Sequence, residues 1–203
     1  LFDQGCDLVI VACNSASASA LREIQQTKLS DYPGKRVLGV IRPTVEELSK
    51  KGFKNILVLS TQATKDSGAY VAEFKKENPD IHVIPHACLK WASLVEAGAV
   101  GTPEMRKEVQ KELRKVQNQD FDAVLLACTH YPFLIPDIET MVPFDVPVYA
   151  QGELVAKSLQ DYLNRHSEIE SKLEKSAKYQ YFTTGDKGRV DVIATERFGF
   201  NVH

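Results

Sequence analysis

Short apolar runs alternate with amphipathic segments along nearly the whole chain. The runs are rich in valine, isoleucine and leucine and have the length of strands, which is typical of strands buried on both faces of a parallel sheet. We expect strands at residues 7–13, 36–41, 54–61, 81–87, 122–128, 146–150 and 179–186. We expect helices between them at residues 15–27, 43–51, 67–77, 102–117, 132–141, 151–175 and 189–200. This alternation predicts a parallel, doubly wound α/β architecture.

Two of the predicted strands repeat one pattern. DLVIVAC ends at Cys13 and DAVLLAC ends at Cys128, and each is followed by small or polar residues that typically begin a helix. The repeat predicts an α/β fold of two pseudosymmetric, doubly wound parallel-sheet domains with the active site between them. Proline-marked segments near Pro43 and Pro147 are the expected crossing points. The first, discontinuous domain is then expected at residues 1–42 and 148–203, and the second at 43–147.

Both repeated cysteines stand where an α/β protein places its ligands. In open parallel sheets, ligands bind just beyond the carboxyl ends of the strands. A cysteine at the start of a helix is also favoured as a thiolate, the reactive form. A buried cysteine with a purely structural role is the alternative, because free cysteine is often a core residue. Asn14, Ser15, Thr129 and His130 follow the two thiols directly and favour a functional site over a structural one.

Composition narrows the possible classes of protein. The chain has 203 residues, of which 43% are hydrophobic and 26% charged, with a net charge of −2. This balance is typical of a globular protein, and no basic surplus indicates a nucleic-acid partner. The apolar runs are too short for membrane helices, and four cysteines are too few for a disulfide scaffold, so we expect a cytoplasmic protein. Because LFDQGCD has the pattern of a helix end and a turn before a strand, we expect a further segment to precede Leu1.

Three kinds of chemistry could use the cysteines and histidines. A zinc site could take His86, Cys88, Cys128 and His130 as ligands, although one residue between ligands is unusual for zinc. A cysteine hydrolase could use either repeated thiol with His130 as its base, but it would leave the other thiol idle. Proton transfer at a carbon acid would use both thiols, one on each face of the substrate, and predicts a racemase or epimerase.

The same segments resemble a known family. ACNSASA at 12–18 and LLACTHYPFL at 125–134 resemble the two signature segments of the glutamate racemases, which are cofactor-independent members of the aspartate/glutamate racemase superfamily. TQATKDSGAY at 61–70, SLVEAG at 93–98 and YFTTGD at 181–186 are also similar to that family. The resemblance implies interconversion of L- and D-glutamate, which supplies D-glutamate for peptidoglycan. It implies glutamate as the small-molecule substrate, with no cofactor, metal, nucleic acid or membrane partner, and a homodimer is expected.

The resemblance also implies roles for individual residues. Cys13 and Cys128 would act on opposite faces of the α-carbon, with His130 and Glu96 assisting the thiols. The residues implied to contact the substrate are Asn14, Ser15, Thr61, Thr64, Thr129 and His130. From the residues alone, Thr61 and Thr64 could instead cap a helix, and Glu96 could be a solvated carboxylate at a helix end.

The chain departs from the family pattern near its start. The family's DSGxGG segment and PYG turn are absent from this sequence, and an aspartate in the first of them is thought to help activate the thiol that corresponds to Cys13. Other functions stay open: racemisation of aspartate or another amino acid, a cysteine hydrolase, or a catalytically silent binding protein.

Overall fold

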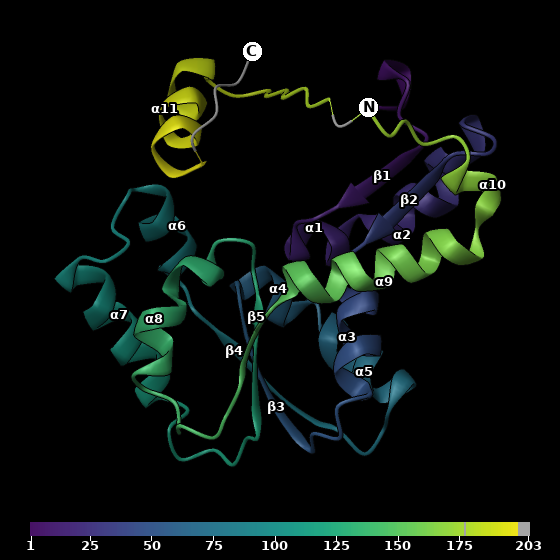
Figure 1. The fold of residues 1–203 in the computed structure, drawn as a ribbon. Coiled ribbons are helices and arrows are strands. Elements are labelled where there is room, and N and C mark those ends of the chain that lie inside the picture. The colour runs from purple at the N-terminus through teal and green to yellow at the C-terminus, as the bar shows by residue number, and fades with distance from the viewer. Residues whose placement is uncertain (177, 199–203) are drawn as a thin grey trace. The chain divides into compact units, whose positions relative to one another are not determined.

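Two parallel sheets form the framework of the chain. The computed structural model describes residues 1–176 and 178–198. These described residues divide into two compact units, one that ends at residue 171 and one that begins at residue 172. The strands are β1 (Leu8–Val11), β2 (Arg36–Gly39), β3 (Asn55–Ser60), β4 (His82–Ala87), β5 (Ala123–Ala127) and β6 (Val148–Ala150). One sheet pairs β1 with β2, the other has the order β4-β3-β5-β6, and every pairing is parallel (Figure 1). The predicted parallel α/β fold is confirmed.

Helices connect successive strands. The longer ones are α3 (Ile41–Ser49), α5 (Ala69–Glu77), α7 (Pro103–Arg114), α9 (Gln151–Arg165) and, in the second unit, α11 (Lys187–Phe198). The shorter ones are α1 (Asn14–Ser19), α2 (Leu21–Glu23), α4 (Gln62–Asp66), α6 (Trp91–Glu96), α8 (Ile135–Glu139) and α10 (Ser167–Glu170). Among the described residues, 3-10 turns lie at Phe2–Gln4, Leu29–Asp31 and Tyr131–Leu134, and a π-helical turn lies at Ile24–Lys28. In the part of the chain that the structure describes, no helix is both long and apolar enough to cross a membrane.

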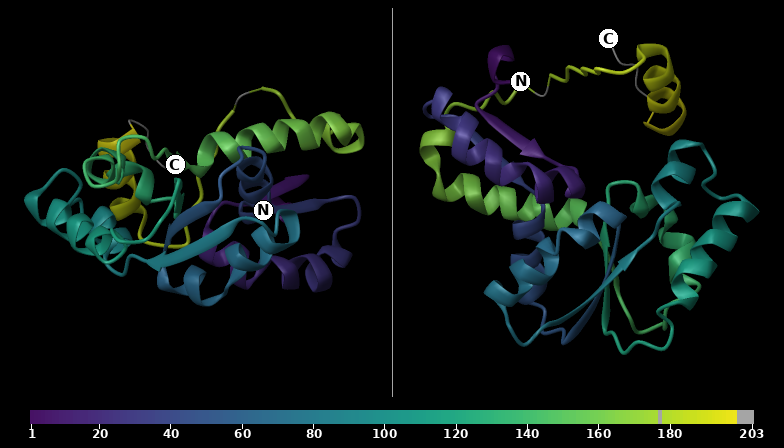
Figure 2. Two further views of the ribbon diagram at one scale, coloured as in Figure 1. Left: turned by 90° about the horizontal axis from the view of Figure 1, so that it is seen from below. Right: turned by 180° about the vertical axis from the view of Figure 1, so that it is seen from behind.

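The four-stranded sheet divides the main core into two layers. Helices α6, α7 and α8 lie on one side of this sheet, and α3 and α5 lie on the other (Figures 1 and 2). Alternate residues of a strand point to opposite faces. Leu57 and Leu126 therefore pack in the layer of α6, α7 and α8, whereas Val58 and Leu125 pack in the layer of α3 and α5. Trp91 of α6 is fully buried in the first layer, with its ring centroid 5.1 Å from that of Tyr131. Because both faces are covered by helices, β5 is apolar along its whole length and β3 is apolar from Ile56 to Leu59.

Local signals explain where several helices begin. Thr102 accepts a hydrogen bond from the Met105 N–H at the start of α7, and Pro103 occupies the first helical position, both as the sequence predicts. Gly68 separates α4 from α5 with a φ of 63°, a conformation that glycine adopts without steric cost.

Two expected elements are wrong. Residues 179–186 form no strand, because the apolar alternation of YQYF suits a strand only where a neighbouring strand can pair with it, and Tyr179 and Phe182 lie exposed. The helix expected at 151–175 ends at Arg165, and after a non-helical His166 the chain resumes as α10. The helix expected at 189–200 is present as α11, and residues 199–200 lie outside the described part of the chain.

Candidate functional site

Strand register brings the predicted site residues of the larger sheet to one edge. Ser60, the last residue of β3, pairs with Ala127 of β5 and with Ala87 of β4. Thr61 and Cys128 are the next residues along their strands, so they leave the sheet side by side at its carboxyl edge. The parallel register therefore gathers at this edge the residues that the sequence places just after the strands.

Cys128, His130 and Glu96 form a connected line of side chains. The Cys128 Sγ lies 3.6 Å from the His130 Nδ1, and the His130 Nε2 lies 3.1 Å from the Glu96 Oε1. The turn after β5 carries the thiol and the imidazole, and the carboxylate stands at the last residue of α6. A carboxylate, an imidazole and a thiol in this order can move a proton on and off the sulfur. Thr129, between the thiol and the imidazole in sequence, is exposed.

The two repeated thiols differ in burial, and charge at Cys13 affects the pKa of Cys128. Cys13 is exposed and occupies the N-cap position of α1, directly beyond β1. Cys128 is buried, and burial raises its pKa above the ordinary value of a thiol. The backbone N–H groups of His130 and Tyr131 oppose this rise, and negative charge at Cys13 adds to it. The pKa of Cys128 therefore depends both on its burial and on the charge at Cys13.

Three hydroxyl groups meet between α1 and α4. The Ser15 Oγ lies 2.8 Å from the Thr61 Oγ1 and 3.1 Å from the Thr64 Oγ1, and the two threonine oxygens are 3.1 Å apart. Thr61 also caps α4, accepting a hydrogen bond from the Thr64 N–H, so the capping role weighed from the sequence is present together with the cluster. Each hydroxyl can donate one hydrogen bond, so the cluster can turn toward a carboxylate.

Asn14 is held by residues that the sequence does not single out. It is buried at the start of α1, where its carboxamide bonds to Tyr70 of α5 and Gln151 of α9. Gln151 also donates to the hydroxyl of Thr44 in α3. The fingerprint TQATKDSGAY contains Tyr70, which is the nearest signal in the sequence, but no local pattern links it to Asn14 or Gln151.

The zinc alternative is not assembled. The His86 Nε2 lies 3.0 Å from the Glu112 Oε2, and Lys115 donates to the same carboxylate at 2.8 Å. Cys88 is 2% exposed, and burial raises the pKa of its thiol, which disfavours the thiolate that a metal needs. Within residues 1–176 and 178–198, no three or more His, Cys, Asp or Glu side chains are gathered to hold a metal ion.

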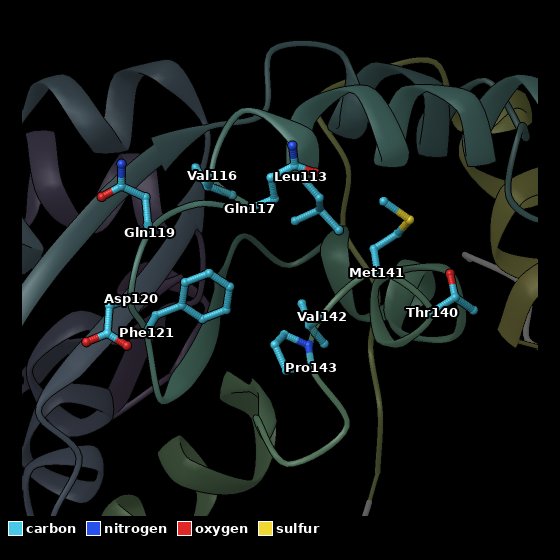
Figure 3. A pocket seen from close by; sticks show the side chains of 10 residues that line it. All are labelled: Leu113, Val116, Gln117, Gln119, Asp120, Phe121, Thr140, Met141, Val142 and Pro143. Atoms are coloured by element: carbon cyan, nitrogen blue, oxygen red, sulfur yellow. The ribbon is translucent and has the colours of Figure 1, made fainter.

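A separate hollow opens at the opposite edge of the larger sheet. Its volume is about 390 Å³, and Figure 3 shows its lining side chains on the end of α7, the chain before β5 and the chain after α8. Phe121 and Met141 make part of the lining, with Asp120 at the rim. The lining comes from residues 113–121 and 140–143, so the hollow holds none of the predicted site residues.

Comparison with known proteins gives a consistent assignment. Residues 1–159 match the family model described as Asp/Glu/hydantoin racemase. A glutamate racemase of Ruegeria pomeroyi is 37% identical over 209 residues, an alignment that covers 97% of this chain and 75% of the relative. A glutamate racemase of Dinoroseobacter shibae is 35% identical, over an alignment that covers 97% of this chain and 74% of the relative.

Solved structures agree with this assignment. A glutamate racemase isoform of Bacillus anthracis superposes with a TM-score of 0.84 at 28% identity, covering 97% of this chain and 71% of that one. A glutamate racemase of Francisella tularensis in complex with D-glutamate has a TM-score of 0.84 at 23% identity, covering 100% and 73%, and supports the fold. These neighbours have the two-domain racemase fold.

Proposed function

This chain belongs to the Asp/Glu/hydantoin racemase family and is an isomerase, and from this premise we propose that it interconverts L- and D-glutamate by proton transfer between two cysteines. The observation that carries the proposal is the pair of thiols at the carboxyl ends of β1 and β5, coupled closely enough that charge at Cys13 raises the pKa of Cys128. Two thiols beside one substrate can serve both faces of its α-carbon.

The proposed reaction balances without a cofactor. A thiolate on one face removes the α-proton, so the C–H bond breaks, an S–H bond forms, and the electron pair stays on the α-carbon. The thiol on the other face then gives its proton to that carbon, which produces the mirror image. Burial keeps Cys128 protonated at neutral pH. Cys128 is then a proton donor in the resting protein.

Neighbouring side chains have separate tasks in this proposal. His130 exchanges the proton of Cys128, across the 3.6 Å contact between sulfur and Nδ1, and Glu96 holds the imidazole at Nε2. The hydroxyls of Ser15, Thr61 and Thr64 turn from one another to the substrate carboxylate. We also propose that Asn14, Thr129 and His130 contact the substrate. The carbanion needs electrostatic stabilisation from such preorganised donors, because the α-proton is a very weak acid.

The two-cysteine mechanism is tested by measuring solvent deuterium incorporation at the α-carbon of L-glutamate together with loss of optical activity. We expect both in the parent protein, and we expect Cys13→Ser and Cys128→Ser each to lose racemisation. Cys6→Ser is the matched control, since Cys6 lies outside the proposed site, and it should keep parental turnover. Near-normal racemisation in either site variant would refute the two-cysteine mechanism. Exchange with aspartate but not with glutamate would replace the proposed substrate.

A cysteine hydrolase is the second candidate, favoured by the Cys128–His130–Glu96 line, which is also a nucleophile, base and orienting group. Such an enzyme would need Cys128 but not Cys13, and it would form a new compound instead of the mirror image. Retained turnover in Cys13→Ser with a product other than glutamate would favour this candidate.

We further propose that the product serves peptidoglycan synthesis in a bacterial cytoplasm. Rescue of a bacterial strain that requires D-glutamate, by the parent chain but not by Cys128→Ser, is the expected outcome. We also propose a homodimer, for which light scattering should give twice the mass of the chain.

A further inference from the structure

Asn14, Tyr70 and Gln151 form a closed ring of hydrogen bonds. The Asn14 Nδ2 donates to the Gln151 Oε1 at 2.5 Å. The Gln151 Nε2 donates to the Tyr70 hydroxyl at 2.6 Å, and that hydroxyl donates to the Asn14 Oδ1 at 2.6 Å. Each residue gives one bond and accepts one within the ring, an arrangement in which the bonds polarise one another.

Burial makes this ring hard to rearrange. Asn14 is 2% exposed, Tyr70 3% and Gln151 9%. Burial raises the pKa of Tyr70, so its hydroxyl stays protonated and keeps its donor role. The second amide hydrogen of Gln151 goes to the Thr44 Oγ1 at 3.0 Å, and Thr44 in turn donates to the Val40 carbonyl. Turning the Gln151 amide over would set its oxygen against Thr44, whose proton is already committed, so one orientation is fixed.

The ring joins the first turns of three helices. Asn14 is the first residue of α1, Tyr70 the second of α5, and Gln151 the first of α9. It also crosses the predicted division of the chain, since Tyr70 belongs to residues 43–147 and its partners do not. Cys13 precedes Asn14 directly, so whatever holds Asn14 also limits the movement of this thiol.

We propose that Tyr70 and Gln151 are positioning residues that clamp the Asn14 carboxamide and thereby keep the Cys13 thiol aimed at the substrate. This inference rests on the proposed function, because it concerns one of the two proposed bases. It assigns the clamp to Cys13 alone. Cys128 is held by the turn after β5 and by its contact with His130.

Two substitutions open the ring with little change in shape. Tyr70→Phe removes the donor to Asn14 and the acceptor of Gln151, and it keeps the aromatic ring in the core. Gln151→Glu replaces the amide that donates to Tyr70 and Thr44 by a carboxylate without an N–H. The matched control is Tyr149→Phe, because it removes the hydroxyl of a tyrosine in β6 that packs against Phe53 and takes no part in the hydrogen-bond ring.

The first measurement needs no substrate. Amide hydrogen exchange followed by mass spectrometry should show faster exchange in residues 8–19 of Tyr70→Phe, with exchange in residues 123–134 unchanged. Tyr149→Phe should match the parent in both segments. Unchanged exchange in residues 8–19 of both ring variants would overturn the clamp, whatever reaction the protein catalyses.

The second measurement separates positioning from a general structural role. Misplacement of a reacting group by about 1 Å costs about 100-fold in rate, so we expect kcat to fall by about 10- to 100-fold in Tyr70→Phe and Gln151→Glu, with a smaller change in KM. If only Cys13 is misplaced, the α-deuterium isotope effect on kcat/KM should rise for one glutamate enantiomer and stay at the parental value for the other. Equal rises for both enantiomers, or parental kcat, would overturn the inference.

The outcomes distinguish this inference from the proposed function. Absence of glutamate racemisation in the parent protein refutes the proposed function, and hydrogen exchange then still decides whether the clamp exists. Racemisation in the parent with parental kcat in both ring variants refutes the positioning role alone. If Tyr70→Phe fails to fold, Thr44→Val is the second variant. It removes the outer bond of Gln151 together with the Thr44 bond to the Val40 carbonyl, and it should give the same one-sided isotope effect with a smaller loss of kcat. A parental isotope effect in that variant would count against the inference.

Discussion

Asp122 fastens the beginnings of β3 and β5 to each other. Its Oδ2 accepts a hydrogen bond from the Lys54 N–H at 2.7 Å, and its Oδ1 accepts one from the Asn55 N–H at 3.0 Å. Its own N–H donates to the Asn55 carbonyl at 3.0 Å. The ladder between the strands begins at the next pair, Ile56 with Ala123. We expect Asp122→Ala to loosen this end of the sheet while the backbone bond to Asn55 remains.

The size of the effect follows from the lost bonds. A hydrogen bond to a charged group contributes about 1.5–3 kcal/mol net. Asp122 is only half-buried, so water replaces part of what is lost. We therefore expect the free energy of unfolding to fall by about 2 kcal/mol in Asp122→Ala. For a chain of this size, that corresponds to a fall in Tm of about 4–8 °C.

Urea unfolding followed by circular dichroism measures this loss. Asp120→Ala is the matched control, because the exposed Asp120 accepts one long contact of 3.4 Å from the Asn55 side chain. A loss in Asp122→Ala within about 0.5 kcal/mol of the control, the usual range of surface substitutions, would refute the reasoning. Turnover of the folded protein should be parental, since Cys128 lies about 20 Å along the strand at about 3.3 Å per residue.

Other perturbations test the coupled thiols, an ion pair and the core. Cys13→Ser should lower the pH midpoint of Cys128 alkylation by iodoacetamide, because charge at Cys13 raises the pKa of Cys128; an unchanged midpoint would contradict the coupling. Lys157→Met should cost about 1 kcal/mol at pH 7 by removing a 2.8 Å bond to the buried Glu47. The hydrogen bonds from Lys157 and Lys50 lower the pKa of Glu47, so its contribution is full above the unfolded pKa of about 4.5 and is lost as the pH falls through the folded value. In urea unfolding, Lys157→Met should therefore lower the free energy of unfolding less at pH 3 than at pH 7. An equal loss at both pH values would exclude the ion pair. Trp91→Ala should cost about 3–5 kcal/mol in the same assay, and Trp91→Phe clearly less, because the indole N–H is buried without a partner in the described structure.

Local sequence patterns predict part of the fold. The continuous apolar runs of β3 and β5 can be stable only when both faces are covered, which identified them as central parallel strands from the sequence. Thr102 and Pro103 gave the start of α7 because a capping oxygen and a missing N–H act within one turn. The strand expected at 179–186 was wrong for the converse reason: a strand exists only through a neighbour, and alternating side chains cannot supply one.

Local sequence patterns likewise predict some features of the candidate site, and tertiary packing decides the others. Cys13 and Cys128 could be predicted as a pair, because the strand that precedes each of them and the helix start that follows are local signals, and ligands bind beyond the carboxyl ends of parallel strands. The sequence alone could not show that the two strands belong to different sheets. The sequence could not give the different burial of the two thiols, nor their electrostatic coupling. The contact of His130 with Glu96, 34 residues earlier in the chain, likewise depends on how α6 packs against the turn after β5.

By itself, the sequence determined the parallel α/β class, the duplicated strand–cysteine pattern and the residue types available to the site, since each depends on neighbours in the chain. Only the tertiary structure decided that Tyr70 and Gln151 close a ring on Asn14, across 56 and 137 residues of sequence. A buried hydrogen bond is directional and requires its partner within about 3 Å. Residues so far apart in sequence reach that distance only after the sheets and helices have packed. No local sequence pattern could therefore predict these hydrogen bonds.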